Sequence, residues 1–295
     1  MITCELCGGL GNQFFQIVAT ISYAIQLNCE YKFTNSETSP SIFNARNTYW
    51  NNLFSELKSV TVDSFPDMIQ IKQPDFKYYE MLEFKELKEI QKLNQDNQDN
   101  QDKQDKEINI KLCGYFQSYK YVEKNYQRIY KILDIENKKQ KTIESSNLTV
   151  NFLENTVSLH FRMGDYKKLH WIHPIMNYNY FLKALNYIKA TDTFSNILYF
   201  CEDEDVNEVN TIICMLKEQF PNNFMRCPDL LDWEQMLLMS LCKHNIIANS
   251  SFSWWGAYLN SNESKIVCYP FEWFGKNVEH DTSDLCPNEW IKIEY

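Results

Sequence analysis

The stretch Gly8-Gly9-Leu10-Gly11-Asn12-Gln13 stands near the start of a 295-residue chain that has only 7 glycines. Glycine is usually about 7% of a globular chain. A cluster of it in a glycine-poor sequence therefore indicates backbone that adopts positive φ or that lets another group approach closely. Residues 2–7 predict a strand and residues 12–28 a helix. A strand, a glycine turn and a helix N-terminus form a place to bind an anion or to pack tightly, and this stretch alone leaves both interpretations open.

The overall composition indicates an acidic globular protein. Hydrophobic residues make up 44% of the chain, and 29 basic against 39 acidic residues give a net charge of −10. The length is sufficient for two domains, each with its own core. Because general nucleic-acid binding needs a basic surface, this charge argues against it. An anionic ligand held in a local basic pocket remains compatible with it.

The targeting signals and the cysteines indicate where the protein works. No apolar run reaches the roughly 18 residues that a membrane span needs, and the first residues lack the basic and apolar regions of a signal peptide. The 10 cysteines lie mostly in apolar stretches, as buried thiols do in a reducing compartment. Cys4 and Cys7 would point to opposite faces of a strand, which argues against a metal pair. We expect a cytoplasmic protein without a membrane anchor.

Two polar segments suggest how the chain is divided. Residues 95–106 are four copies of Gln-Asp-(Asn/Lys), which offer nothing to bury, so we expect a disordered insert at about 94–107. Residues 138–147 contain no apolar residue except Ile143 and predict a boundary region. We therefore expect two domains, 1–145 and 146–295.

The second half alternates between strand and helix patterns. Repeated βα units imply a parallel sheet with helices on both faces. Ligands of such sheets bind at the carboxyl ends of the strands. Strands are predicted at 157–161, 197–201, 224–226, 245–248 and 265–269, and helices at 177–189, 206–220, 232–243 and 253–259.

The end of the first of these strands carries an unusual pair of side chains. In Val157-Ser158-Leu159-His160-Phe161-Arg162, a period of two places His160 and Arg162 on one face, where the chain continues into Met163-Gly164-Asp165-Tyr166. An interior arginine is costly unless it meets an anion. Its planar fork of donors suits a phosphate. This strand end therefore predicts an anion site.

The second strand end, Cys201-Glu202-Asp203-Glu204-Asp205, is acidic and has two interpretations. Asp203 and Asp205 have the spacing of a metal-binding pair. Alternatively, Asp203 accepts hydrogen bonds from a base or ribose, while its neighbours favour the N-terminus of the next helix.

The third strand end, Ala248-Asn249-Ser250-Ser251-Phe252-Ser253-Trp254-Trp255-Gly256, opens a helix with small hydroxyl residues. Hydroxyls and backbone amides at a helix N-terminus form a phosphate cradle, although a simple N-cap would use one of them. Together the three strand ends offer a basic pair, a carboxylate and hydroxyl or amide groups, which is a set that suits a nucleotide diphosphate.

Three motifs also carry a resemblance. Residues 8–16, the run His160-Phe161-Arg162-Met163-Gly164-Asp165-Tyr166 and residues 248–257 resemble the three signatures of the α-1,2-fucosyltransferase family, family 11 of the glycosyltransferases. Residues 265–274 and Pro287-Asn288-Glu289-Trp290 are similar to its C-terminal part. The chain departs from the pattern at Met163, where the family usually has a second arginine, and in the Gln-Asp repeat.

The resemblance implies an α/β fold of GT-B type, with two Rossmann-like domains facing across a cleft. It implies an inverting enzyme that moves L-fucose from GDP-β-L-fucose to a hydroxyl of a glycan acceptor, in α-1,2 linkage to galactose or a similar terminal sugar. It implies no cofactor and no obligatory metal. The acceptor and the oligomeric state stay open. Two alternatives remain, namely a GDP-sugar- or glycan-binding protein without turnover and a metal-dependent GT-A transferase that uses Asp203 and Asp205.

The resemblance also implies roles for particular residues. Arg162 would bind the pyrophosphate and stabilise the leaving GDP, and His160 would help to hold the donor. For the catalytic base, Asp165 is the first candidate and His160 the second, although Asp165 is also suited to capping the turn. The donor site would further contain Gly9, Gly11, Asn12, Asp203, Asn249, Ser250, Ser251 and Phe252.

Overall fold

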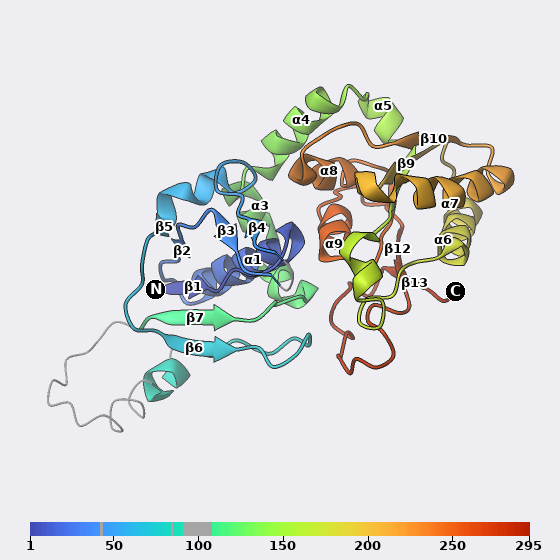
Figure 1. Ribbon diagram of the computed structural model, residues 1–295. Coiled ribbons are helices and arrows are strands. Elements are labelled where there is room, and N and C mark those ends of the chain that lie inside the picture. Colours follow the sequence, from blue (N-terminus) through green and yellow to red (C-terminus); the bar gives the residue numbers. More distant parts are fainter. Residues whose placement is uncertain (42–43, 84, 91–107) are drawn as a thin grey trace, which may run out of the picture. The chain divides into compact units, whose positions relative to one another are not determined.

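The computed structural model describes residues 1–41, 44–83, 85–90 and 108–295. The chain forms two compact units (Figure 1), Met1–Asp134 with Asp281–Cys286 and Ile135–His280 with Pro287–Tyr295. The passage between them at residues 134 and 135 precedes helix α4 (Ile135–Ser146), which occupies the polar segment expected as a boundary. The insert expected at 94–107 lies outside the described residues.

The first unit is built on a parallel sheet of three strands in the order β1-β7-β6. These are β1 (Ile2–Cys4), β7 (Ile110–Cys113) and β6 (Ile69–Lys72). Helix α1 (Leu10–Gln26) follows the glycine turn, and most of its residues are buried because aliphatic and aromatic side chains recur around it. The predicted strand, turn and helix are confirmed, with a shorter strand and an earlier helix start.

The remaining elements of the first unit are short. Periodicity also predicts one continuous helix over 119–135, and this is wrong, because the segment forms two 3₁₀ turns and then a short α-helix whose N-cap residue is Asn125. Asn125 Nδ2 donates to the carbonyl oxygen and to Oγ of Ser22, at 3.3 and 3.0 Å, which ties the start of this helix to α1. These elements are β2 (Phe33–Thr34), β3 (Thr38–Ser39), β4 (Arg46–Asn47), η1 (Ser55–Val60), β5 (Thr61–Val62), η2 (Tyr119–Tyr121), η3 (Glu123–Asn125) and α3 (Tyr126–Ile132).

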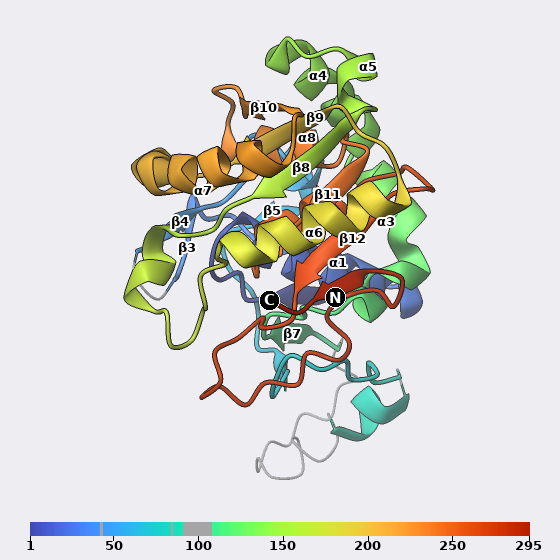
Figure 2. The ribbon, with the colours of Figure 1, turned by 90° about the vertical axis from the view of Figure 1, so that its right-hand side faces the viewer.

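The second unit is built on a sheet of six strands, and every pair in it is parallel. Helices α6 (Tyr178–Thr191) and α7 (Val206–Gln219) cover one face, and α8 (Asp232–Met239) and α9 (Ser251–Tyr258) the other (Figures 1 and 2). A short helix α5 (Val150–Leu153) precedes the first strand. The strands are β8 (Thr156–His160), β9 (Asn196–Phe200), β10 (Asn223–Arg226), β11 (His244–Ile246), β12 (Val267–Pro270) and β13 (Ile291–Ile293).

Side chains that alternate along the strands of the second unit form a hydrophobic core on each face of its sheet. Ile197 packs with residues of α6 and α7, whereas its neighbour Leu198 packs with residues of α8. Successive side chains of a strand point to opposite faces, so a central strand with helices on both faces must be apolar throughout. The predicted α/β class with helices on both faces is confirmed. Among the described residues, no helix is long and apolar enough to cross a membrane.

The strand order β10-β9-β8-β11-β12-β13 places a topological switch between β8 and β11. The chain builds outward from β8 to β10 and then returns to the other side of β8 with β11. This is the order of dinucleotide-binding folds, whose ligands bind beyond the carboxyl ends of the two strands at the switch. A buried amide fixes this junction, since Asn245 Nδ2 donates to Ser158 Oγ and to the Met239 carbonyl oxygen, both at 2.7 Å.

One local prediction is wrong and one strand was not predicted. Asp232 and Gln235 have the spacing of a capping box, which predicts Asp232 as the cap of this helix, but Leu231 is the N-cap residue and the helix begins at Asp232 itself. The Glu234 carboxylate accepts from the Leu231 amide at 3.1 Å. Gln235 instead donates to the Leu230 carbonyl oxygen. Strand β13 was not predicted at all, since three residues are too few to show a period.

Candidate active site

Two loops meet at the switch point of the second unit. The chain leaves β8 at His160 and turns through Arg162 into the 3₁₀ helix η4 (Gly164–Lys168). On the neighbouring strand it leaves β11, passes Asn249 and Ser250, and enters α9. The rings of His160 and Phe252 lie 5.5 Å apart. The structure therefore brings together the first and third of the predicted strand ends.

Arg162 is held by groups from two loops. Its Nη2 donates to Asp165 Oδ1 and its Nη1 to Glu202 Oε1, at the end of β9. Its guanidinium carbon lies 5.0 Å from the centre of the Tyr166 ring, within the range of a cation–π interaction. The side chain is 21% exposed. A planar cation with a part of its surface open therefore stands at the carboxyl edge of the sheet.

The turn that carries Arg162 is fixed by its own backbone. Gly164 has φ +24°, and a Cβ there would collide with the Glu202 carboxylate. The Gly164 amide donates to Oδ2 of the buried Asp205 at 2.7 Å, and Lys167 Nζ lies 2.8 Å from Oδ1 of the same carboxylate. A glycine therefore lets Glu202 reach Arg162, and Asp205 anchors the turn.

Tyr166 joins the two loops. Its hydroxyl donates to the Asn249 carbonyl oxygen at 3.0 Å. Burial raises the pKa of Tyr166 to about 12, so the hydroxyl keeps its proton and the bond persists at neutral pH. The cation–π contact to Arg162 and the bond to Asn249 together tie the turn after β8 to the turn after β11.

His160 is buried, and its ring nitrogen Nδ1 has no hydrogen-bond partner among the described residues. Burial, with the charge of Arg162 as a further cause, lowers its pKa from 6.5 to about 3. The imidazole is therefore neutral at physiological pH. A buried polar atom without a partner is costly, so this position is suited to a ligand atom that completes the hydrogen bond. The same low pKa makes His160 a weak base.

The start of α9 is arranged differently from a simple N-cap. Ser250 occupies the N-cap position, yet its hydroxyl makes no capping hydrogen bond. The first amides of a helix have no partner within the helix, and they favour an anion. Asn249 braces this loop, because its Nδ2 donates to the carbonyl oxygens of Pro174 and Trp273 at 3.0 and 3.1 Å. Its Oδ1 is buried without a partner among the described residues.

The acidic strand end splits into two roles. The Asp203 side chain is 95% exposed and pairs with Arg226 at the end of β10, whereas Asp205 is buried under the turn at Gly164. Carboxylate oxygens of Glu202, Glu204 and Asp205 lie within 4.8 Å of one another. Because Arg162 and Lys167 already neutralise two of these three, the geometry gives little support to the alternative of an Asp203–Asp205 metal pair.

The glycine turn of the first unit uses most of its polar atoms internally. Gln13 Nε2 lies 3.0 Å from the Gly8 carbonyl oxygen, 3.0 Å from Ser39 Oγ and 2.9 Å from the Asn47 carbonyl oxygen. Gln117 Nε2 donates to Asn12 Oδ1 at 2.8 Å. Gly8 has φ +79°, which explains one glycine. Gly11 is buried in α1.

Gly9 differs from its neighbours. It is the N-cap residue of α1 with φ −77°, and a Cβ built on it would meet nothing within 4 Å. Neither its backbone conformation nor packing inside the first unit requires a glycine. Glycine is a favoured N-cap residue, and it also permits the close approach of a group from outside this turn.

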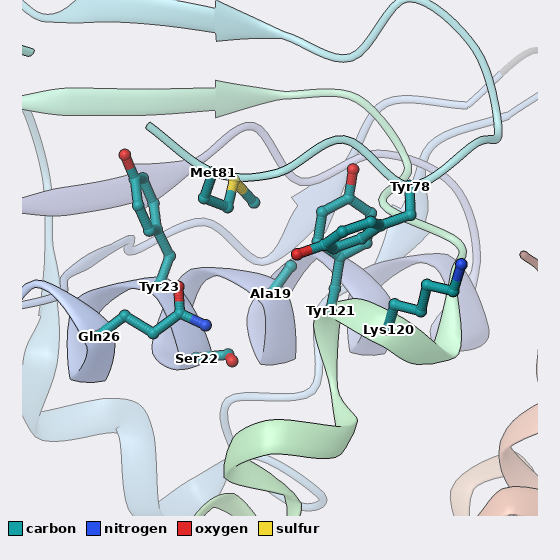
Figure 3. Close-up of a pocket in the computed structure, with 8 residues that line it drawn as sticks. All are labelled: Ala19, Ser22, Tyr23, Gln26, Tyr78, Met81, Lys120 and Tyr121. Carbon is teal, nitrogen blue, oxygen red and sulfur yellow. The ribbon is translucent and has the colours of Figure 1, made fainter. Parts of the chain in front are cut away.

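The first unit also contains a small pocket beside α1 (Figure 3). Tyr23 and Gln26 on the helix face Tyr78, Met81, Lys120 and Tyr121, and Ala19 and Ser22 complete the lining. Its volume of about 10 Å³ is about the space of one water molecule. The pocket therefore does not hold a sugar or a nucleotide.

Three residues near Arg162 were not assigned a role from the sequence. Glu202 and Tyr166 contact its guanidinium, and His173 stacks on Tyr166 with ring centres 4.5 Å apart and planes 16° from parallel. Glu202 and Tyr166 lay inside the quoted strand ends, so proximity to Arg162 was the available signal. His173 stands alone in a loop, and no spacing in the sequence marks it.

Two units that each rest on a parallel sheet, one with an arginine at its switch point, define a two-domain α/β protein of GT-B type, the class predicted above. The sequence profile of Glycosyl transferase family 11 matches residues 1–294. The chain belongs to this family. The resemblance carried by the three motifs is confirmed.

The chain is similar to several characterised proteins. It is 39% identical over 145 residues to the O-antigen biosynthesis glycosyltransferase WbnK of Escherichia coli, covering 47% of this chain and 45% of that protein. It is 30% identical over 195 residues to the alpha-1,2-colitosyltransferase of Escherichia coli, covering 63% of each. The matches thus span less than two thirds of either relative. The fucosyltransferase NodZ from Bradyrhizobium aligns over 88% of this chain and 93% of its own, with a TM-score of 0.46 and 15% identity.

Proposed function

We propose that the protein transfers L-fucose from GDP-β-L-fucose to a glycan hydroxyl, with inversion, in α-1,2 linkage to galactose or a similar terminal sugar. The observation that carries the proposal is Arg162, a partly open guanidinium at the β8–β11 switch point of a family 11 glycosyltransferase. Around it stand a neutral His160 and the start of α9. This set suits a pyrophosphate and does nothing useful for a neutral glycan.

Each group has a place in donor binding. Arg162 exchanges its carboxylate partners for the pyrophosphate, whose charge it matches with two parallel donors. The Ser250 hydroxyl and the amides at Ser251 and Phe252 receive phosphate oxygens at the helix N-terminus. His160 Nδ1 and Asn249 Oδ1, both without a partner among the described residues, bond to polar atoms of the donor. We keep Asp203 as a contact to the nucleoside, and Gly9, Gly11 and Asn12 as donor contacts of the first unit.

The chemistry follows from the charges that develop. The acceptor oxygen attacks C1 of the sugar, and the bond from C1 to the β-phosphate oxygen breaks with its electron pair leaving on GDP. Arg162 and the α9 amides oppose that growing negative charge. A fixed cation and fixed dipoles at the leaving group lower the barrier without reorganising. We propose that no metal ion is required, because protein groups already supply this charge.

The identity of the transferred sugar needs its own test, because one relative is a colitosyltransferase. Colitose is L-fucose without its 3-hydroxyl. A site that hydrogen-bonds this hydroxyl rejects the analogue that lacks it, by up to about 10⁴-fold. A site that merely tolerates the hydroxyl discriminates far less, by about 10²-fold at most.

The experiment compares both donors on one panel of acceptors. The protein is incubated with GDP-fucose or GDP-colitose and galactose-, N-acetylglucosamine- or rhamnose-terminated oligosaccharides, with and without EDTA, and products are resolved by mass spectrometry and linkage analysis. We expect an α-1,2-fucosylated product that forms equally with EDTA. Higher kcat/KM with GDP-colitose would replace the proposed sugar. Binding of GDP without any product would favour a binding protein, and loss of activity in EDTA would favour the metal-dependent alternative.

A further inference from the structure

An inverting transfer needs a group that removes the proton of the acceptor hydroxyl. The two residues expected for this task are poorly placed to perform it. His160 is buried and its pKa is lowered to about 3, so it binds a proton too weakly. Asp165 is engaged by the Arg162 guanidinium. The structure places a third group beside them.

His173 lies in the loop after η4 and forms part of a row of rings. It stacks on Tyr166, at 4.5 Å between ring centres, and it also contacts Phe274 at 5.7 Å. Tyr166 in turn contacts Arg162, with 5.0 Å from its ring centre to the guanidinium carbon. The Tyr166 ring therefore contacts both this imidazole and the guanidinium that we assign to the pyrophosphate.

The backbone around His173 is held from several directions. The His173 amide donates to the Leu169 carbonyl oxygen at 2.8 Å, and the next residue, Pro174, accepts from Asn249 Nδ2 at 3.0 Å. Gly275, beside Phe274, donates its amide to the Ile172 carbonyl oxygen at 2.8 Å. The loop after β11 thus fixes the position of this imidazole relative to the start of α9.

One nitrogen of the imidazole nevertheless lacks a hydrogen-bond partner among the described residues. This nitrogen, Nδ1, is buried. A side chain that served only to pack would be better replaced by phenylalanine, because an orphaned polar atom costs stability. The backbone hydrogen bonds fix the position of the ring while its nitrogen has no partner. This combination indicates that the nitrogen bonds to a substrate atom.

We propose that His173 is the base that accepts the proton of the acceptor hydroxyl. This inference rests on the proposed function and extends it. As the acceptor oxygen forms its bond to C1 and GDP leaves with the electron pair of the broken C1–O bond, the hydroxyl proton passes to one nitrogen of His173 and from there to solvent. When the pyrophosphate occupies Arg162, Asp165 is released to face the other nitrogen and orient the ring.

The charges around His173 agree with this role. Burial lowers its pKa, with Arg162 and His280 acting in the same direction and Asp165 opposing them. The imidazole is therefore neutral and able to accept a proton at physiological pH. Pyrophosphate on Arg162 would cancel one of the lowering charges, so the base would strengthen when the donor is bound.

The test uses two variants in the full chain that separate the ring from its nitrogens. His173→Phe keeps an aromatic ring between Tyr166 and Phe274 but removes the base, and His170→Ala removes an exposed histidine of the same loop as a matched control. We expect His173→Phe to lower kcat by about 10²- to 10⁴-fold, with GDP affinity by calorimetry unchanged. His170→Ala should keep the activity of the unmodified protein.

The pH profile supplies a second readout. In the unmodified protein kcat/KM should fall as pH drops through the pKa of His173, below the ordinary histidine value, and His173→Phe should lose this acidic limb. Full activity of His173→Phe, a parallel loss of GDP binding, or an unmodified enzyme without an acidic limb would each overturn the inference. If the unmodified protein transfers colitose from GDP-colitose and not fucose from GDP-fucose, the proposal about the sugar is wrong. The role of His173 is then tested in the same way with GDP-colitose as the donor.

Discussion

The turn after β1 and the turn after β8 are built alike, each from a strand, at least one glycine and a helical start, but only the second contains a partly exposed charged side chain. After β1, Gln13 donates within its own unit, and Asn12 accepts from Gln117. After β8, Arg162 is partly open, and His160 has a nitrogen without a partner among the described residues. Each turn leaves one buried side-chain atom without a partner among the described residues, Gln13 Oε1 and His160 Nδ1. Only the second places that atom next to a partly exposed cation.

The difference teaches that glycine density and chemical function are separate signals. Gly8 is required by a positive φ, and Gln13 holds the turn around it. Gly164 is required because Glu202 approaches the backbone where a Cβ would be. A glycine cluster therefore marks where the backbone conformation is restricted, while a ligand site is indicated where a partly exposed charge stands beside a polar atom without a partner.

The largest expected effect on activity comes from substituting Arg162 in the turn after β8. Arg162→Ala should lower kcat/KM for the donor by about 10³-fold or more, because it removes a charged donor aimed at the leaving group. Arg162→Lys keeps the charge but loses the planar fork, so its loss should be intermediate. Steady-state kinetics with GDP-fucose measure both.

The control for Arg162 is an arginine outside the site. Arg128 is exposed on α3 of the first unit, and Arg128→Ala should behave like the unmodified protein. Circular dichroism and Tm verify that each variant is folded. A folded Arg162→Ala protein with near-normal turnover would refute the assignment of the pyrophosphate to this turn.

The next prediction compares one glycine from each turn. Gly164→Ala should reduce the free energy of unfolding by about 1–3 kcal/mol, because it forces a side chain into strained backbone against Glu202. It should also displace Arg162 and lower activity by more than about tenfold, since a shift of about 1 Å near the reacting groups costs up to 10²-fold.

Gly9→Ala should have the opposite signature. Its φ of −77° suits alanine, and a Cβ there meets nothing within 4 Å, so Tm should not fall. If the donor approaches this turn, KM for GDP-fucose rises while stability is kept. Unchanged KM and kcat would mean that Gly9 does not contact the donor, and the first turn would then be purely structural.

Part of the fold and of the candidate site could be predicted from the sequence. Periodicity predicted the strand–helix alternation of the second unit, because apolar positions there obey the packing of a two-faced sheet. Strand ends then placed His160, Arg162 and Ser250 together. The sequence did not predict β13, the start of α3 at Asn125 or the placement of His173 beside Tyr166, because these depend on contacts between residues far apart in the chain. Asn125 meets Ser22, and His173 meets Phe274. No local pattern encodes such pairs.

A smaller effect concerns stability in acid. The pKa of His160 falls from 6.5 to about 3 on folding, so between these values the unfolded chain binds a proton that the folded protein excludes. Stability is therefore lost as pH falls below about 6.5, and at pH 4.5 the loss from this residue is about 2–3 kcal/mol.

His160→Gln, which cannot titrate, tests that linkage. The decrease of Tm between pH 7 and pH 4.5 should be smaller in His160→Gln than in the unmodified protein, by several degrees. Equal decreases would show that His160 is not held neutral by burial. The same variant should weaken GDP-fucose binding, because it removes the nitrogen that we assign to the donor.

The smallest expected effect is at Asp203, on the acidic strand end beside the second turn. Its side chain is exposed and pairs with Arg226, and such surface pairs contribute about 0–1 kcal/mol, so Asp203→Asn should leave Tm nearly unchanged. As a nucleoside contact, it should raise KM for GDP-fucose a few-fold, in line with one hydrogen bond of about 1 kcal/mol, and leave kcat unaltered. A metal ligand would behave differently, since its loss would collapse kcat and make the residual activity depend on added Mn²⁺ or Mg²⁺. A KM effect without a kcat effect, equal in EDTA and in Mg²⁺, would therefore place Asp203 at the rim of the donor site and leave charge stabilisation to Arg162 and α9.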